Sequence, residues 1–205
     1  ELDSNVFNIK QVSDRVANMF QSQTHANEVV FTAEIDDNLD IAVLSDDLRL
    51  SQILHNLLSN AFKFTRKGSV IFKVICKERT DDTVVVHFSV ADTGIGIKED
   101  QQAEIFEQFT QAESGTARQF GGTGLGLAIC KQLIEKFNSR IDLKSVYGKG
   151  SEFSFSIVFN TNIPAEKTII ENDQSEQSAL YNCKILVAED NPVNMMLIDS
   201  FLKRW

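Results

Sequence analysis

Several residue types are scarce in this chain of 205 residues, and each scarcity excludes a class of protein. There are three cysteines, Cys76, Cys130 and Cys183, an odd count whose spacing fits no metal motif. We therefore expect reduced core thiols in a reducing compartment. No apolar run approaches the length of a membrane span, and no signal peptide is recognisable. We expect a cytoplasmic location, with membrane anchoring of a longer parent protein left open.

Positive charge is also in short supply. Lysine and arginine total 20 against 29 aspartates and glutamates, so the net charge is −9 and the pI about 4.8. That balance argues against nucleic acid as a partner, because such binding depends on neutralising phosphates. A site for ATP needs only a few local cations, so the acidic net charge does not exclude one. The apolar content of 42% is ordinary for a globular protein of one domain, or one domain plus a fragment.

Hydrophobic periodicity predicts helices alternating with strands. Helices are expected at about 8–24, from the capping residues 45–47 to just before Lys67, and at 125–137. Strands are expected at 29–35, 70–76, 84–90, from 141 onward and at 153–159. A long loop from 94 to about 124 should hold a short helical piece at 102–109.

The composition changes near residue 161. Residues 161–182 are polar, acidic and without a sustained period, which is typical of a linker. A strand then ends in the carboxylate pair Glu189 and Asp190, and Asn191-Pro192 starts a helix. We expect the end of a dimerisation helix or a linker at 1–6, one domain at 7–160, a linker at 161–182 and the beginning of another domain at 183–205.

Four polar residues of the second predicted helix, Gln52, Asn56, Asn60 and Lys63, are spaced by four, four and three. They fall on one stripe, away from the leucine-rich face. Amide oxygens are suitable ligands for Mg²⁺, and an ammonium group offsets phosphate charge. The stripe is therefore either a magnesium-phosphate site or a plain solvated face. His55 lies next to it.

A second group of residues follows the central strand. Asp92 ends that strand and precedes Thr93-Gly94-Ile95-Gly96. An acid there can accept a hydrogen bond from an adenine amino group, although an ordinary Asp-Gly turn is the alternative. The glycines at 121–126 supply backbone N–H groups at a helix start, which is an anion site. Neither the dinucleotide-binding pattern nor the P-loop pattern fits these glycines.

Taken in order, residues 56–63, 92–97, 106–109, 121–127 and 148–153 resemble the N, G1, F, G2 and G3 boxes of sensor histidine kinases. The resemblance covers about residues 7–159 and implies the ATP-binding catalytic domain of the GHKL superfamily. That family has a two-layer α/β sandwich, the Bergerat fold, with a mixed sheet on three main helices and a long ATP lid, here at about 98–120. The tail is similar to the opening of a receiver domain, with an incomplete magnesium site at Glu189 and Asp190.

The resemblance also implies roles for individual residues. Asn60 would chelate Mg²⁺, Asn56 and Lys63 would lie at the phosphates, and Arg118 would reach the γ-phosphate. Asp92 would bind adenine. The implied nucleotide contacts are Asn56, Asn60, Lys63, Asp92, Gly94, Gly96, Ile97, Phe109, Gly122, Thr123, Gly124, Leu125, Gly126 and Leu127. The sequence departs from the family at Gln119, where a second basic residue is common, and at Asn138-Ser139, where a Gly-Gly pair is common at a helix end.

The expected activity is transfer of the ATP γ-phosphate to a histidine on the dimerisation domain of the same kinase, and then to an aspartate of a receiver domain or response regulator. The parent would be a homodimer. His25, His55 and His87 all lack the acceptor motif, so this chain alone should bind ATP without phosphorylating itself. One alternative is a related ATPase, but those enzymes have a glutamate where Asn56 stands, and an amide is no base. His55 is the nearest candidate base. A nucleotide-responsive binding module is the non-enzymatic alternative.

Overall fold

Seven strands form one mixed sheet in the part of the chain that the structure describes. The computed structural model describes residues 2–21, 28–107 and 125–163. Its elements in chain order are β1 (Asn5–Asn8), α1 (Ile9–Gln21), β2 (Glu28–Ile35), η2 (Asp37–Leu39), β3 (Ala42–Ser45), α2 (Asp47–Phe64), β4 (Lys67–Arg79), β5 (Thr83–Asp92), η3 (Glu99–Gln101), η4 (Glu104–Phe106), α4 (Gly126–Lys136), β6 (Asp142–Val146) and β7 (Gly150–Asn160). The strand order is β1-β3-β7-β5-β4-β2, and β6 pairs with β7 off this path.

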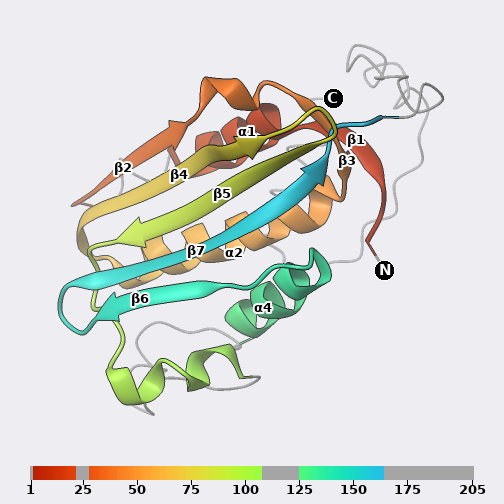
Figure 1. Cartoon of the computed structure of the whole chain (residues 1–205). Coiled ribbons are helices and arrows are strands. Elements are labelled where there is room, and N and C mark those ends of the chain that lie inside the picture. Colours follow the sequence, from red (N-terminus) through yellow and green to blue (C-terminus); the bar gives the residue numbers. More distant parts are fainter. Residues whose placement is uncertain (1, 22–27, 108–124, 164–205) are drawn as a thin grey trace, which may run out of the picture. The chain divides into compact units, whose positions relative to one another are not determined.

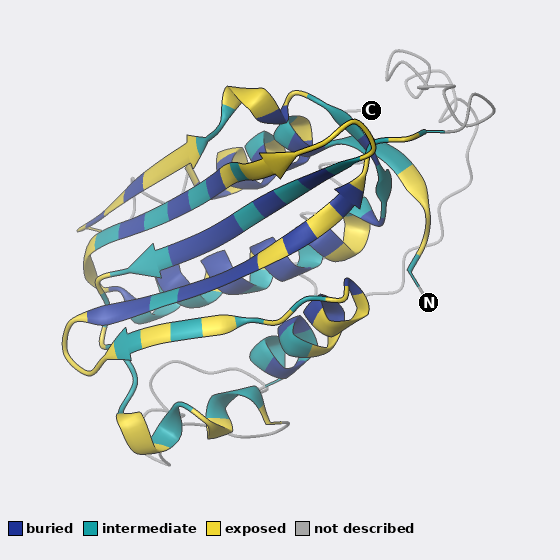
Figure 2. Ribbon diagram, in the orientation of Figure 1, coloured by how far each residue is buried: buried dark blue, intermediate teal, exposed yellow. Residues whose placement is uncertain are grey.

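The sheet and the helices make two layers. Strands β2 and β4 pair in parallel, whereas β5 pairs antiparallel with both β4 and β7. Helices α1, α2 and α4 lie on one face of the sheet (Figure 1). Figure 2 shows the first half of β7 mostly buried and buried and exposed residues alternating over its second half, residues 155–160, where only one face lies in the core. The predicted α/β sandwich with a mixed sheet and three main helices is confirmed.

Helix α2 is central to the core. Its leucine-rich face supplies five side chains that are at most 1% exposed: Leu50, Ile53, Leu54, Leu57 and Leu58. They face the fully buried side chains of β4 and β5, such as Phe72 and Phe88. Burying one such side chain contributes about 1.5–3 kcal/mol, so this face fixes the helix firmly against the sheet. The opposite, polar stripe of α2 is thereby held in a defined position.

The start of α2 is fixed by Asp46, which is 2% exposed. Its Oδ1 atom accepts a hydrogen bond from the backbone N–H of Arg49 at 2.9 Å, which makes it the N-cap. Its Oδ2 atom accepts another from the backbone N–H of Asp3 at 3.0 Å. The predicted capping run therefore acts through Asp46, and the same carboxylate attaches the N-terminal segment to the helix.

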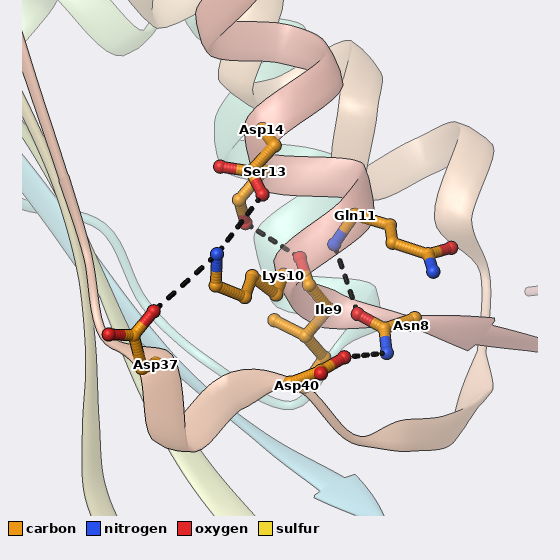
Figure 3. Close-up of polar contacts among 8 residues, drawn as sticks. All are labelled: Asn8, Ile9, Lys10, Gln11, Ser13, Asp14, Asp37 and Asp40. Carbon is orange, nitrogen blue, oxygen red and sulfur yellow. Dashed lines mark hydrogen bonds and ion pairs between the residues drawn. The ribbon is translucent and has the colours of Figure 1, made fainter.

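The start of α1 is tied to η2 (Figure 3). Asn8 caps α1 by accepting from the backbone N–H of Gln11 at 3.0 Å, and its Nδ2 donates to Asp40 at 2.8 Å. Lys10 Nζ lies 3.4 Å from Asp14 and 3.5 Å from Asp37, and Asp14 is the larger cause of the raised pKa of this lysine. These contacts fix the helix that packs against α2 through Phe20 and Phe62.

Three local predictions need correction. The four-residue strands β1 and β3, which pair with each other, were not predicted. Residues 2–4 are not helical and Asn5 begins β1, so of the two alternatives for 1–6, a helix end or a linker, residues 2–6 contain no helix, and the linker stays a prediction. The helical piece expected at 102–109 consists, up to residue 107, of two 3-10 turns at Glu99–Gln101 and Glu104–Phe106.

The cysteine prediction holds for Cys130, which is fully buried, and in part for Cys76, which is half-buried against the core. Cys183 lies outside the described residues. Among the helices of residues 2–21, 28–107 and 125–163, none combines the length and apolar character needed to cross a membrane.

Candidate nucleotide-binding site

The polar stripe of α2 faces α4. Burial raises the pKa of the Cys130 thiol on α4, and the nearby side chain of Asn56 lowers it in part. One turn further along α2, Nδ2 of Asn60 lies 4.0 Å from the point where a Cβ on Gly126 would stand. The two predicted asparagines therefore meet the start of the helix that follows the glycine-rich run.

The other members of the stripe make local contacts. Oε1 of Gln52 accepts a hydrogen bond from Arg49 at 3.0 Å. Lys63 Nζ lies 5.0 Å from the ring centre of Phe64. Lys63 stands one turn beyond Asn60, near the end of the helix where the predicted phosphate contacts would be.

His55 lies on another side of the helix. Its ring centre is 5.3 Å from that of Phe20 on α1, whereas Asn56 and Asn60 approach α4. The structure thus separates His55 from the amide stripe, and its role as a base assisting the acceptor stays a prediction.

Asp92 stands at the end of β5, opposite Val70 of β4 and Ser151 of β7. Burial raises the pKa of its carboxyl, and hydrogen bonds from the backbone N–H groups of Gly94 and Ser151 partly offset that effect. A half-buried carboxylate with defined donors is a positioned acceptor. The contact from Gly94 is that of an Asx turn, so the structure contains the Asp-Gly turn, and the adenine-binding role of Asp92 stays a prediction.

The loop after Asp92 packs on the end of α2. The backbone N–H of Ile95 donates to the carbonyl oxygen of Phe64 at 3.3 Å. A Cβ on Gly94 would lie 2.4 Å from that same oxygen, so only glycine allows this approach. Since Phe64 is four residues beyond Asn60, the strand-end acid and the amide stripe belong to one locality.

The β6–β7 hairpin closes on the same loop. Gly96 has a φ of +63°, and a Cβ there would lie 2.1 Å from the carbonyl oxygen of Val146. The backbone N–H of Gly148 donates to Ile95 at 2.7 Å, and that of Ile97 to Ser145 Oγ at 2.8 Å. The 92–97 and 148–153 segments are therefore brought together.

Several predicted site residues lie outside the part of the chain that is described: Phe109, Arg118, Gly122, Thr123, Gly124, Glu189 and Asp190. Leu125 and Leu127 are described, half-buried at the start of α4 beside Gly126, and Leu127 packs against the core. Asn138 takes a left-handed φ of 55° just after α4, the conformation that a glycine often supplies at the end of a helix. Asn138, where relatives often have a glycine, therefore serves to end the helix.

Two residues at this site were not singled out by sequence reasoning. The Sγ atom of Cys130 donates to the backbone carbonyl of Ile53 on α2 at 3.8 Å, and the sequence analysis noted only the place of this cysteine in an apolar run. Thr65, the C-cap of α2, is 2% exposed, and its Oγ1 has no hydrogen-bond partner among the described residues. The signal in the sequence was the position of Thr65 directly after Lys63 and Phe64 at the end of the polar stripe.

The fold is an α/β sandwich in which the end of α2, the loop after Asp92 and the β6–β7 hairpin lie close together. Residues 45–161 match the family described as histidine kinase-, DNA gyrase B-, and HSP90-like ATPase. The chain therefore belongs to this family. It is an ATP-binding catalytic domain of the histidine kinase type, as the resemblance implied.

Known proteins with similar sequences and structures include histidine kinases. The sensor histidine kinase GacS of Pseudomonas protegens is 36% identical over 171 residues, which cover 83% of this chain and 18% of that protein. The crystal structure of full-length ShkA in complex with AMPPNP superposes with a TM-score of 0.65 at 33% identity, covering 80% of this chain and 33% of that one. The nucleotide-free catalytic domain of histidine kinase ThkA gives 0.59 at 28% identity, covering 76% and 95%. The chain thus spans about a fifth of the kinase GacS and nearly all of the isolated ThkA domain.

Proposed function

We propose that this domain binds Mg²⁺-ATP between α2, the 92–97 loop and α4, and presents the γ-phosphate to a histidine on the dimerisation domain of its parent kinase. The observation that carries the proposal is the convergence on one locality of Asn60, beside Gly126, and Asp92, whose loop packs on Phe64. AMPPNP, bound in the related ShkA structure, is an ATP analogue, which supports a triphosphate at the equivalent place.

The roles follow from the chemistry of the side chains. Asp92 would accept a hydrogen bond from the adenine amino group, and Gly94 and Gly96 keep the loop close to α2 and to the hairpin. Asn56 and Lys63 would contact the phosphates. Ile97 would also contact the nucleotide, together with Phe109, Arg118 and the glycines at 122 and 124, which lie outside the described residues.

The described residues contain no cluster of three or more histidine, cysteine or acidic side chains that could hold a metal alone. Mg²⁺ is commonly held by one or two protein oxygens together with substrate phosphates, so the amide oxygen of Asn60 fits as its protein ligand. When bound, the ion would neutralise charge on the transferred phosphate.

Calorimetric titration with ATP and ADP, with and without Mg²⁺, tests the binding step. Transfer is tested by incubating the chain with γ-labelled ATP, alone and with a separately supplied dimerisation domain that carries the acceptor histidine. We expect label on the acceptor domain and none on this chain. Stable labelling of this chain contradicts the assignment of its histidines. Phosphate release without transfer favours the ATPase alternative, and binding with neither outcome favours the nucleotide-responsive module.

His55 is tested separately in the intact kinase. If it assists the acceptor, His55→Ala slows phosphorylation more than it weakens ATP binding. Equal losses, or none, would leave His55 as a packing residue beside Phe20, which is the contact it makes in the structure.

We also propose the division of the chain into a catalytic domain at 7–160, a linker at 161–182 and the first strand and helix of a receiver domain from 183. The change in composition at 161 and the pair Glu189-Asp190 support it. The partners would then be the dimerisation domain and a receiver domain or response regulator. Limited proteolysis should cut first within 161–182 and leave the catalytic domain whole, whereas first cuts within the sheet would contradict this division.

A further inference from the structure

The backbone of Ile97, the last residue of the loop after Asp92, is held by two side chains. Its N–H group donates to Oγ of Ser145 on β6 at 2.8 Å. Its carbonyl oxygen accepts a hydrogen bond from Nε2 of Gln102 at 3.0 Å. Gln102 directly follows the turn η3. Because one side chain holds the N–H group and another holds the carbonyl, the position of Ile97 depends on both Ser145 and Gln102.

Gln102 joins this loop to the β6–β7 hairpin. Besides its contact with Ile97, its Nε2 atom donates to the carbonyl oxygen of Ser145 at 3.1 Å. The nitrogen of a side-chain amide has two protons, and here each proton has a carbonyl acceptor. The oxygen end of the amide could not replace the nitrogen, because a carbonyl oxygen has no proton to offer it. The two contacts therefore fix the orientation of the amide as well as its place.

Ser145 is itself held by β7. Its hydroxyl donates to the carbonyl oxygen of Gly150 at 3.1 Å, and its Oγ atom lies 2.9 Å from Oγ of Ser151, which is 8% exposed. Since a hydroxyl has one proton and this one is given to Gly150, the Oγ atom accepts from both Ser151 and Ile97. Ser145 thus has its full set of hydrogen bonds, and it gives Gln102 a firm point of attachment.

We propose that Gln102 is a positioning residue for the nucleotide site, because its amide group sets where Ile97 stands against the adenine base. The inference rests on the proposed function, in which Ile97 contacts the nucleotide. The side chain of Ile97 packs against the core, so its contact with a base is an apolar one. Such a contact is sensitive to small displacements, because dispersion attraction falls steeply with distance. Without Gln102, the carbonyl group of Ile97 loses its partner, and the residue can shift away from the base.

Two adjacent glutamines allow a matched comparison. Gln102→Met removes both hydrogen bonds at a similar volume and without a charge, and we expect it to weaken ATP binding about three- to tenfold. Gln102→Glu sets an acceptor against two carbonyl oxygens and should cost more than about tenfold. The side chain of Gln101 makes neither contact. Gln101→Met and Gln101→Glu should therefore stay within about twofold of the wild type.

The measurement is calorimetric titration of the whole chain with ATP and with ADP in magnesium, at a temperature at which circular dichroism shows each variant folded. Because Gln102 acts at the base, it should weaken the binding of both nucleotides by the same factor. A double-mutant cycle tests the route of the effect. If Gln102 acts through Ile97, adding Gln102→Met to Ile97→Ala causes little further loss. A merely structural role would lower the unfolding temperature and leave the affinity of the folded variant unchanged.

The outcomes separate the two claims. A wild-type chain that does not bind ATP overturns the proposed function and this inference with it. The inference alone is overturned if the wild type binds and Gln102→Met keeps its affinity, loses more for ATP than for ADP, or adds its full loss in the cycle. The segment has a second attachment, because Phe106 packs edge to face on Phe153 with the ring centres 6.3 Å apart, so the variants should fold. If the methionine variant does not fold, Gln102→Leu removes the same amide and decides in its place.

Discussion

Oδ1 of Asp92 accepts a hydrogen bond from the backbone N–H of Gly94 at 2.8 Å, so the acid is held by the loop that follows it. The contact gives Asp92 a fixed orientation between β4 and β7. It does not fully compensate the carboxylate for its burial, and the pKa of the group stays raised. Because the pKa stays raised, the stability of the protein should depend on pH through Asp92.

The first prediction concerns pH. Because the pKa of Asp92 is raised above its ordinary value of 3.8, the folded protein binds this proton more tightly than the unfolded chain does. The stabilisation that it gives is fully present below pH 3.8 and is lost as the pH rises through the raised pKa. Asp92→Asn should lack this component. Urea unfolding of both proteins across that range measures it, and a wild-type-minus-variant difference that is flat or rises with pH contradicts the prediction.

A second prediction contrasts two glycines of the site. Gly94→Ala puts a Cβ 2.4 Å from the carbonyl oxygen of Phe64, which is backbone and cannot turn away. We expect a loss of about 1–3 kcal/mol in the free energy of unfolding. Among the described residues, the Cβ of Gly126→Ala would meet only Nδ2 of Asn60 at 4.0 Å, and the residue lies in a helix, so stability should hold or rise by about 0.5–1 kcal/mol. The added methyl group faces the site, and we expect weaker ATP binding.

Denaturation and titration of these two variants check the contrast. Equal stability of both would mean that the loop does not pack on α2 as closely as the structure has it. Unchanged ATP affinity in Gly126→Ala would place the nucleotide away from Asn60.

A third prediction uses the buried hydroxyl of Thr65, which has no partner among the described residues. Replacing it by valine removes a polar group that burial has desolvated. We expect Thr65→Val to raise the free energy of unfolding of the ligand-free chain by about 1 kcal/mol. Thr93→Val is the matched control, because Thr93 Oγ1 accepts from the backbone N–H of Ser69 at 2.8 Å, and its loss should cost about 1 kcal/mol. Equal losses in both variants would show that Thr65 is hydrogen-bonded in solution.

A fourth prediction concerns the cap of α2. Asp46→Ala removes both the N-cap and the contact with Asp3. We expect a loss of about 1–2 kcal/mol in stability, while Asp46→Asn keeps an oxygen acceptor and costs less. Asp47, at the next position, makes neither of these two contacts. Asp47→Ala should therefore lower the free energy of unfolding by only a few tenths of a kcal/mol. Thermal or urea unfolding of the three variants measures the difference, and an Asp47 effect equal to that of Asp46 would refute the capping argument.

Helix α2 could be predicted almost residue by residue, because a buried face repeated every three to four residues is a local signal and Asp46 marks its start. Strands β1 and β3 could not be predicted. Each has four residues and neither alternates clearly, and they exist because Asn5 pairs with Ser45 across about forty residues of sequence. Short strands take their stability from the partner strand, which a local pattern does not reveal.

The sequence by itself determined the order of the longer helices and strands, the family and the chemical kind of each site residue, because periodicity and glycine spacing are local properties of the chain. Only the tertiary structure decided which side chains meet. It set His55 against Phe20, placed Asn60 beside Gly126, and brought the loop after Asp92 onto the carbonyl of Phe64. These contacts depend on how helices and strands pack across long sequence separations, and that packing is a property of the whole core.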